Sequence, residues 1–189
     1  TAIALPVKAF GDLESHLIRF KALSNASNNE MNALRETAVK LGLSSQFNAT
    51  EIAQTSVELT RMGFNATQTK EALAGVTFAA QASGESLNDI SRVMGGVINA
   101  FGMTAKESTH VSDVLVKAAN LSQASVSQMG ISFRYVGSVA KSSNQSFEDT
   151  AGVLTALAKT GLSASMVGNH LQNMLLKLQA PTKMGKAAL

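Results

Sequence analysis

Cysteine and tryptophan are absent from this 189-residue sequence, which contains one tyrosine and eight phenylalanines. Without cysteine, the chain has no disulfide framework, no thiolate nucleophile and no zinc–thiolate site. The net charge of +3 comes from 16 basic and 13 acidic residues that are scattered along the chain. A nucleic-acid groove would combine clustered basic residues with aromatic stacking residues, so we expect no specific nucleic-acid recognition.

Charged residues are also scarce, at 15% of the chain, whereas an average globular protein has about a quarter. Serine, threonine, asparagine and glutamine supply the polar surface instead. Because few charges oppose contact, such a surface associates readily, and we expect a protein that packs against partners or copies of itself. Hydrophobic residues make up 45% of the chain, which is enough to build a core.

No run of about 18 apolar residues is present, so the sequence predicts no helix that spans a bilayer. The nearest candidate, residues 72–80, is too short and contains Gly75 and Thr77. The chain begins at Thr1 without an initiator methionine, shows no signal peptide and does not end like a natural terminus. We expect it to be an excerpt from a longer protein.

Apolar residues recur at spacings of three and four, as in amphipathic helices, and no alternation of period two predicts a strand. Serine, threonine or asparagine precedes these segments as an N-cap does, and glycine follows them as at a helix end. The expected N-caps are Asn48, Asn65, Ser86, Thr104, Ser125, Ser146 and Ser163, and the expected terminal glycines are Gly42, Gly63, Gly102 and Gly161. We predict an all-α, compact multi-helix bundle of eight or nine helices, over residues 7–24, 28–41, 49–62, 66–82, 86–101, 105–120, 125–140, 147–160 and 164–179.

The first two of these segments share a heptad pattern, which predicts a coiled-coil-like segment over residues 1–43. Its polar middle, residues 24–29, favours a hairpin between two helices, and a continuous helix within an oligomer is the alternative. We expect residues 44–181 to form a helical core domain and residues 182–189 to begin a linker. The heptad positions are Phe10, Leu13, Leu17, Phe20, Ser24, Ser27, Met31, Leu34, Ala38 and Leu41.

An internal repeat relates residues 53–66 to residues 151–164 at a constant offset of 98. Each copy has the pattern of a helix that ends at glycine, followed by a cap and a second helix. Two copies predict pseudo-twofold packing of helical hairpins and not a long solenoid. Small residues one turn apart, such as Gly75 with Ala79 and Gly96 with Ala100, predict close approach between helices.

Three histidines, His16, His110 and His170, are the first candidates for metal or acid–base chemistry. They lie far apart in the sequence, and none has a metal-ligand spacing such as HExxH. His110 and Asp113 share a helix face, where an acid–base pair is one interpretation and a surface hydrogen bond is the one we favour. We therefore predict no metal site.

Ser138 and Lys141 have the SxxK spacing of some serine acyl-transferases, but the companion motifs are missing. Glu148 and Asp149 fall in a first helical turn, where carboxylates favour the positive end of the helix dipole. Hydrolysis by paired carboxylates would need a second acid across a cleft, and the sequence identifies none. We predict no catalytic residue, no cofactor and no enzymatic activity.

An ordered series of short motifs resembles the early conserved block of phage tail tape measure proteins. The series covers about residues 10–181, and its specificity comes from the order of the motifs. Two positions depart from the pattern: Asn169-His170 stands where a threonine and a variable residue are expected, and Ser138 stands where proline is frequent. The motifs are Leu41-Gly42, 47–53, Leu59, 63–66, 73–76, Ala79-Ala80, 111–115, 118–120, 135–137, 146–151, 161–165, Gly168, Leu171, Leu178 and Pro181.

The resemblance implies a structural component of a phage or prophage tail, made in the bacterial host cytoplasm and lying in the lumen of the tail tube. It implies a role in templating tail length and, after release, in assisting DNA entry into the host. The implied partners are tail tube, tail tip or baseplate, and tail-assembly chaperone proteins, with host-membrane contact expected through other parts of the full protein. We expect this segment to fold as a bundle when free and to extend if it is threaded along the lumen.

Two alternatives from other functional classes remain. An envelope-active module would insert an amphipathic helix such as residues 86–101 into the host membrane, although that helix has little lysine or arginine on its polar face. Part of a peptidoglycan hydrolase would require a catalytic acid, for which Glu148 is the residue to test.

Overall fold

The computed structural model describes residues 4–179, and the regular structure of these residues is helical, without a strand. This confirms the predicted all-α class. Each predicted segment corresponds to one helix, and a short 3-10 turn, η1 (Ala105–Glu107), precedes the sixth. The linker predicted at residues 182–189 lies outside the described residues. The helices are α1 (Ala4–Ser24), α2 (Asn28–Ser44), α3 (Ala49–Arg61), α4 (Ala66–Ser83), α5 (Leu87–Phe101), α6 (Ser108–Ser122), α7 (Val126–Ser142), α8 (Phe147–Ala158) and α9 (Ala164–Gln179).

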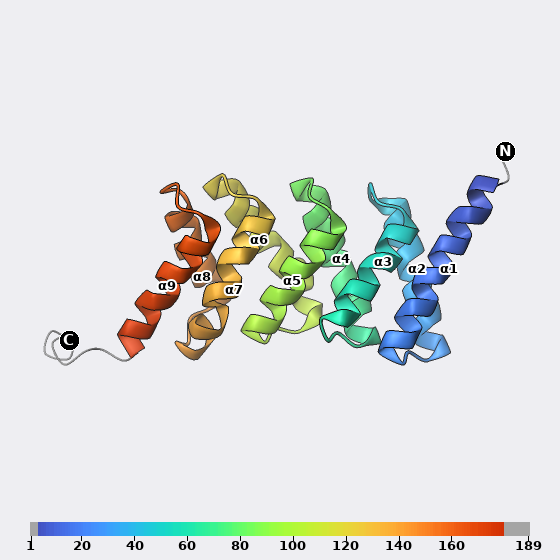
Figure 1. The fold of residues 1–189 in the computed structure, drawn as a ribbon, viewed down its shortest axis with the longest axis horizontal. Coiled ribbons are helices and arrows are strands. Elements are labelled where there is room, and N and C mark those ends of the chain that lie inside the picture. The colour runs from blue at the N-terminus through green and yellow to red at the C-terminus, as the bar shows by residue number, and fades with distance from the viewer. Residues whose placement is uncertain (1–3, 180–189) are drawn as a thin grey trace, which may run out of the picture.

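The helices form two layers along an elongated bundle (Figure 1). Helices α1, α3, α5, α7 and α9 lie in the front layer of this view, which we call the odd layer, and α2, α4, α6 and α8 lie behind in the even layer. The most extensive packing joins helices two positions apart along the chain, such as α7 with α9 and α4 with α6. Because consecutive helices run in opposite directions, the helices of one layer are parallel, and the turns alternate between two edges of the molecule.

Hydrogen bonds between neighbouring helices of one layer define the register of the stack. In the odd layer, Asn99 Nδ2 donates to the carbonyl oxygen of Met62, 37 residues earlier. In the even layer, His110 Nε2 bonds Glu148 Oε1, 38 residues later. A shift of 37 or 38 residues therefore leads from a position on one helix to the equivalent position on the next helix of the same layer.

The helix ends follow local chemistry. At most N-termini, the predicted N-cap side chain accepts the backbone N–H three residues on, which satisfies one unpaired donor of the first turn. Full capping boxes occur at Ser27, Asn48, Asn65 and Ser125. Residues with positive φ in the turns are Asn25, Gly63, Gly84, Gly102, Gln123, Asn144 and Gly161.

Gly42 was expected to end the second helix, and this prediction is wrong. Helix α2 continues to Ser44, and its C-cap Ser45 has an extended conformation. A Cβ atom on Gly42 would lie 2.8 Å from the backbone nitrogen of Ala49. Glycine at this position therefore allows the end of α2 to approach the start of α3, and it is not required for a left-handed turn.

The coiled-coil interpretation of residues 1–43 is not confirmed, whereas the break between two helices is. The chain turns at Asn25, which has a φ of 52°. Helix α1 packs mainly against α3, and α2 packs against α3 and α4, so the two heptad segments do not form a paired seam. Leu17, Phe20, Leu34 and Ala38 are instead buried in the common core.

The two copies of the 98-residue repeat are the hairpins α3–α4 and α8–α9, which have the predicted helix–turn–helix form. They lie in different parts of the row, so they do not pack on each other as a pseudo-twofold pair (Figure 1). The offset of 98 residues spans five helices, which places α3 in the odd layer and its counterpart α8 in the even layer. The hairpins α3–α4 and α8–α9 therefore begin in opposite layers and lie at different positions along the row.

Apolar side chains between the layers form one extended core. Helix α5 contributes the largest continuous share, because its apolar stripe at spacings of three and four faces inward. The phenylalanines of α5, α7 and α8 meet in this core, with ring centroids 5.0–5.8 Å apart. The largest fully buried side chains are Phe20, Phe133, Leu17, Leu34, Ile52, Leu59, Leu73, Ile90, Met94, Leu115, Met129 and Leu154.

Candidate functional site

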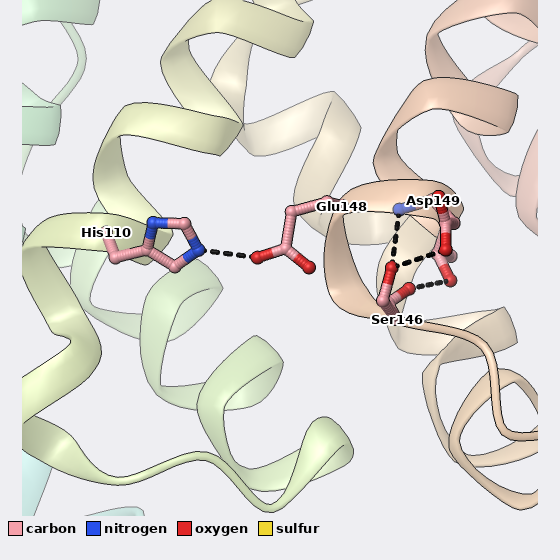
Figure 2. Close-up of polar contacts among 5 residues, drawn as sticks. His110, Ser146, Glu148 and Asp149 are labelled. Atoms are coloured by element: carbon pink, nitrogen blue, oxygen red, sulfur yellow. Dashed lines mark hydrogen bonds and ion pairs between the residues drawn. The ribbon is translucent and has the colours of Figure 1, made fainter.

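His110 and Glu148, which are 38 residues apart in the sequence, are in direct contact in the structure (Figure 2). His110 lies in the first turn of α6, and Glu148 lies in the first turn of the neighbouring parallel helix α8. The distance from His110 Nε2 to Glu148 Oε1 is 2.5 Å. Both side chains are about half exposed, at 52% and 53%. The histidine thus bonds across the layer, and not to Asp113 on its own helix as we expected.

A second carboxylate, Glu107, lies near this pair and was not predicted as a site residue. Glu107 belongs to η1 and accepts hydrogen bonds from the backbone N–H and the hydroxyl of Thr104, at 2.7 and 2.8 Å. Glu107 and Glu148 both line a surface hollow of about 410 Å³ at the α5–α6 and α7–α8 turns. The capping-box spacing of Thr104 and Glu107 was present in the sequence, but nothing local indicated that Glu107 would lie beside Glu148.

The electrostatic environment of both carboxyl groups favours the ionised form. The hydrogen bond from His110 is the main cause that lowers the pKa of Glu148 below its ordinary value. The backbone hydrogen bond from Thr104 is the main cause that lowers the pKa of Glu107. A general acid in glycoside hydrolysis needs a raised pKa. The pKa values of Glu107 and Glu148 are shifted in the opposite direction.

The other candidate residues do not gather around this hollow in a catalytic arrangement. Ser138 is exposed on α7, and the Lys141 ammonium lies against Gly102 at the C-terminus of α5, where a cation is favoured by the helix dipole. His16 and His170 lie on α1 and α9, at opposite ends of the row. Asp149 accepts a hydrogen bond from Ser146 Oγ at 2.7 Å, as part of the α8 cap (Figure 2).

Two negative findings apply to residues 4–179. No group of three or more histidine, cysteine, aspartate or glutamate side chains in this range is arranged to hold a metal ion. No helix in the same range is both long enough and apolar enough to cross a membrane.

Glu148→Gln is expected to lower the free energy of unfolding by about 0.2–1 kcal/mol at neutral pH, the range for exposed ion pairs. Because folding lowers the pKa of Glu148, its contribution is present above the ordinary pKa and is lost as pH falls through the lowered value. Urea unfolding of both proteins across this pH range would measure the difference. The control is Glu36→Gln on α2, which lies outside the contact; an equal effect there, or a pH-independent difference at Glu148, would contradict the assignment.

A second surface feature is an apolar groove of about 470 Å³ between α4 and α6 in the even layer. Phe78 and Ala82 form one wall, and Val116 and Leu121 contribute to the other. Phe78 is 59% exposed although phenylalanine is usually buried. This groove therefore has the character of a contact surface for another macromolecule, and the hollow beside Glu148 does not.

Comparison with known proteins gives the family. Residues 35–189 match the family described as phage-related minor tail protein. The chain belongs to this family. It is 31% identical to the tape measure protein of Pneumococcus phage Dp-1, over 97% of this chain and 17% of that protein. It is 29% identical to a probable tape measure protein of Escherichia phage P2, over 84% of this chain and 19% of that protein.

These relatives confirm the resemblance to tape measure proteins and assign this member of the minor tail protein family a structural role in the phage tail. The chain spans less than a fifth of the length of either relative. No solved structure matches the chain.

Proposed function

We propose that this chain is a segment of a tape measure protein that sets the length of a phage tail tube and afterwards assists DNA entry into the host. The observation that supports this proposal is its relation, along almost its whole length, to proteins named tape measure protein. In this role the segment lies in the lumen of the tail tube. Its partners there are the tube and tip proteins, and before assembly they include tail-assembly chaperones.

A helical chain is physically suited to the role of a ruler, because each residue adds a fixed rise of about 1.5 Å. The folded bundle has a second, shorter length scale: parallel helices of one layer are separated by about 8–10 Å. One two-helix unit of 37 or 38 residues therefore corresponds to about 10 Å when folded and to about 55 Å as a continuous helix. These two values distinguish a folded segment from an extended one in the tail.

The test is a deletion in the phage that encodes the full-length protein. Removal of residues 87–125 joins Ser86 to Val126, so a serine N-cap still precedes the following helix. Cryo-electron microscopy of intact tails is expected to show a shortening of about 60 Å for an extended segment or about 10 Å for a folded one. Duplication of the same residues is the matched control and should lengthen the tail by the same amount. Tails of unchanged length in both variants would overturn the proposal.

We further propose that this segment acts by contact and not by catalysis. The lowered pKa values of Glu107 and Glu148 disfavour a protonated acid at the hollow that both glutamates line. Zymography of the purified chain on peptidoglycan is expected to show no cleared band. A cleared band that Glu148→Gln removes would contradict this part of the proposal.

Membrane insertion by the helix at residues 86–101 has little structural support. Ile90, Met94 and Val97 of α5 are fully buried in the core, so insertion would require the bundle to open. The exposed apolar groove lies on the opposite layer, between α4 and α6.

A further inference from the structure

The apolar groove of the even layer belongs to a longer feature, which we call the apolar band. Phe78 of α4, Val116 of α6 and Val153 of α8 define it. Phe78 and Val153 are 59% and 40% exposed, and Val116 lines the groove beside Phe78. Val116 follows Phe78 by 38 residues, and Val153 follows Val116 by 37.

These spacings are within one residue of the hydrogen bonds between the same helices, in which Ser108 of α6 bonds Glu71 of α4 over 37 residues and His110 of α6 bonds Glu148 of α8 over 38; one residue is about 1.5 Å along a helix. The three side chains therefore lie at one level on three successive parallel helices. Together they form a row along the long axis of the molecule, perpendicular to the helices. Positions on the outer face of a helix are usually occupied by polar residues. The three residues of this row are apolar.

Charges are distributed unequally on the two sides of the apolar band. On α8, Asp149 and Glu148 precede Val153 and Lys159 follows it. On α6, Asp113 precedes Val116 and Lys117 follows it. All five charged side chains are exposed. Lys70 of α4 and Lys106 of η1 are also exposed on the side that precedes the band, so that side is acidic mainly at α6 and α8, and Lys117 and Lys159 lie on the opposite side.

We propose that the apolar band is the interface between two copies of this chain, related by a twofold axis that runs along the band. A half-turn about this axis brings each band residue opposite its own counterpart and makes the facing helices antiparallel. The same rotation brings the acidic side of one copy over the basic side of the other. Lys159 then faces Asp149 of the second copy.

At α8, this axis places Lys159 of one copy opposite a carboxylate of the second copy, so unlike charges meet there. An isologous dimer requires such self-complementarity of a single patch.

The available area is sufficient for a stable dimer. Four even-layer helices at spacings of about 8–10 Å, with lengths of about 18–27 Å, present a face of about 800 Å² per copy. A standard protein–protein interface buries about 800 Å² of each partner. This interface does not depend on the proposed role in tail length, because it concerns the chain in solution.

The absence of cysteine from the chain allows a direct test with single-cysteine variants. Phe78→Cys, Val116→Cys and Val153→Cys are each expected to form disulfide-linked homodimers under mild oxidation, because each position lies near the twofold axis and faces itself. Mixtures of the Phe78 and Val153 variants should yield homodimers and few mixed dimers. Predominantly mixed dimers would overturn the proposed axis.

Ile131→Cys and Tyr135→Cys provide matched controls, since both residues are exposed on α7 in the odd layer. These variants are expected to remain monomeric on non-reducing gels. Light scattering of the unmodified chain should show dimers, and Lys159→Glu should weaken the dimer at least tenfold, with an unchanged circular dichroism spectrum. A monomeric chain whose band variants do not cross-link would overturn the proposal. So would a monomer that binds phosphatidylglycerol vesicles through Phe78, which would assign the band to lipid.

Discussion

Phe133→Ala is expected to lower the free energy of unfolding by about 3–5 kcal/mol, the largest effect of any single substitution considered for this chain. Phe133 lies on α7 and is fully buried. Its ring centroid lies 5.8 Å from that of Phe101 on α5 and 5.0 Å from that of Phe147 on α8. The substitution removes a large apolar group from the point where both layers meet and leaves a cavity that the surrounding helices fill only in part.

Urea unfolding followed by circular dichroism would measure this loss. Tyr135→Ala is the matched control, because Tyr135 lies on the same helix, has a side chain of similar size and is 40% exposed. Surface substitutions of this kind usually change the free energy of unfolding by no more than about 0.5 kcal/mol. Equal losses for the two variants would contradict the position of Phe133 at the centre of the core.

Gly75→Ala is expected to destabilise the chain by about 1–3 kcal/mol, although alanine is the better helix former. A Cβ atom on Gly75 would lie 2.4 Å from the carbonyl carbon and oxygen of Ser108, at the start of α6. These are backbone atoms, so relief requires α4 and α6 to move apart. That movement would also disturb the bond from Ser108 Oγ to the Glu71 carbonyl oxygen, which is 3.1 Å long.

Gly152→Ala is the matched control for this prediction. Gly152 lies inside α8, and a Cβ atom there would have nothing within 4 Å. The substitution is therefore expected to stabilise the chain by about 0.5–1 kcal/mol, the ordinary advantage of alanine over glycine in a helix. If thermal or urea unfolding showed that both alanine variants are stabilised, the close approach of α4 and α6 would be refuted.

Features with a short range in sequence were predicted well. The side chain of Asn65 caps the first turn of α4 through a group only three residues away, so the signal for this helix start is contained in four residues. Gly63 and Gly161 each occupy a positive-φ turn that residues with a side chain rarely adopt. Such interactions form in almost any tertiary context, and they explain why the helix bounds agree closely with the structure.

Features that depend on a distant partner were missed or misassigned. The Glu85 carboxylate accepts the backbone N–H groups of Val126 and Ser127, at 2.7 and 3.1 Å, and so caps α7 from a turn 41 residues earlier. His110 was assigned to Asp113, its neighbour on the helix, but it bonds Glu148. In both cases the residue type favours a hydrogen bond. The sequence does not show which helices lie side by side, or at what register, so it could not identify the partner.

By itself, the sequence determined that this chain is helical, where most helices begin and end, and that it resembles tape measure proteins. Those properties depend on backbone conformation, on caps three residues away and on the order of short motifs. Only the tertiary structure decided that the helices stack in two parallel layers, that Gly42 marks a close contact and that Phe78, Val116 and Val153 share one row. An apolar stripe specifies that a helix face is buried but not which helix buries it, because the hydrophobic effect has no direction and the partner is selected by the packing of the whole chain.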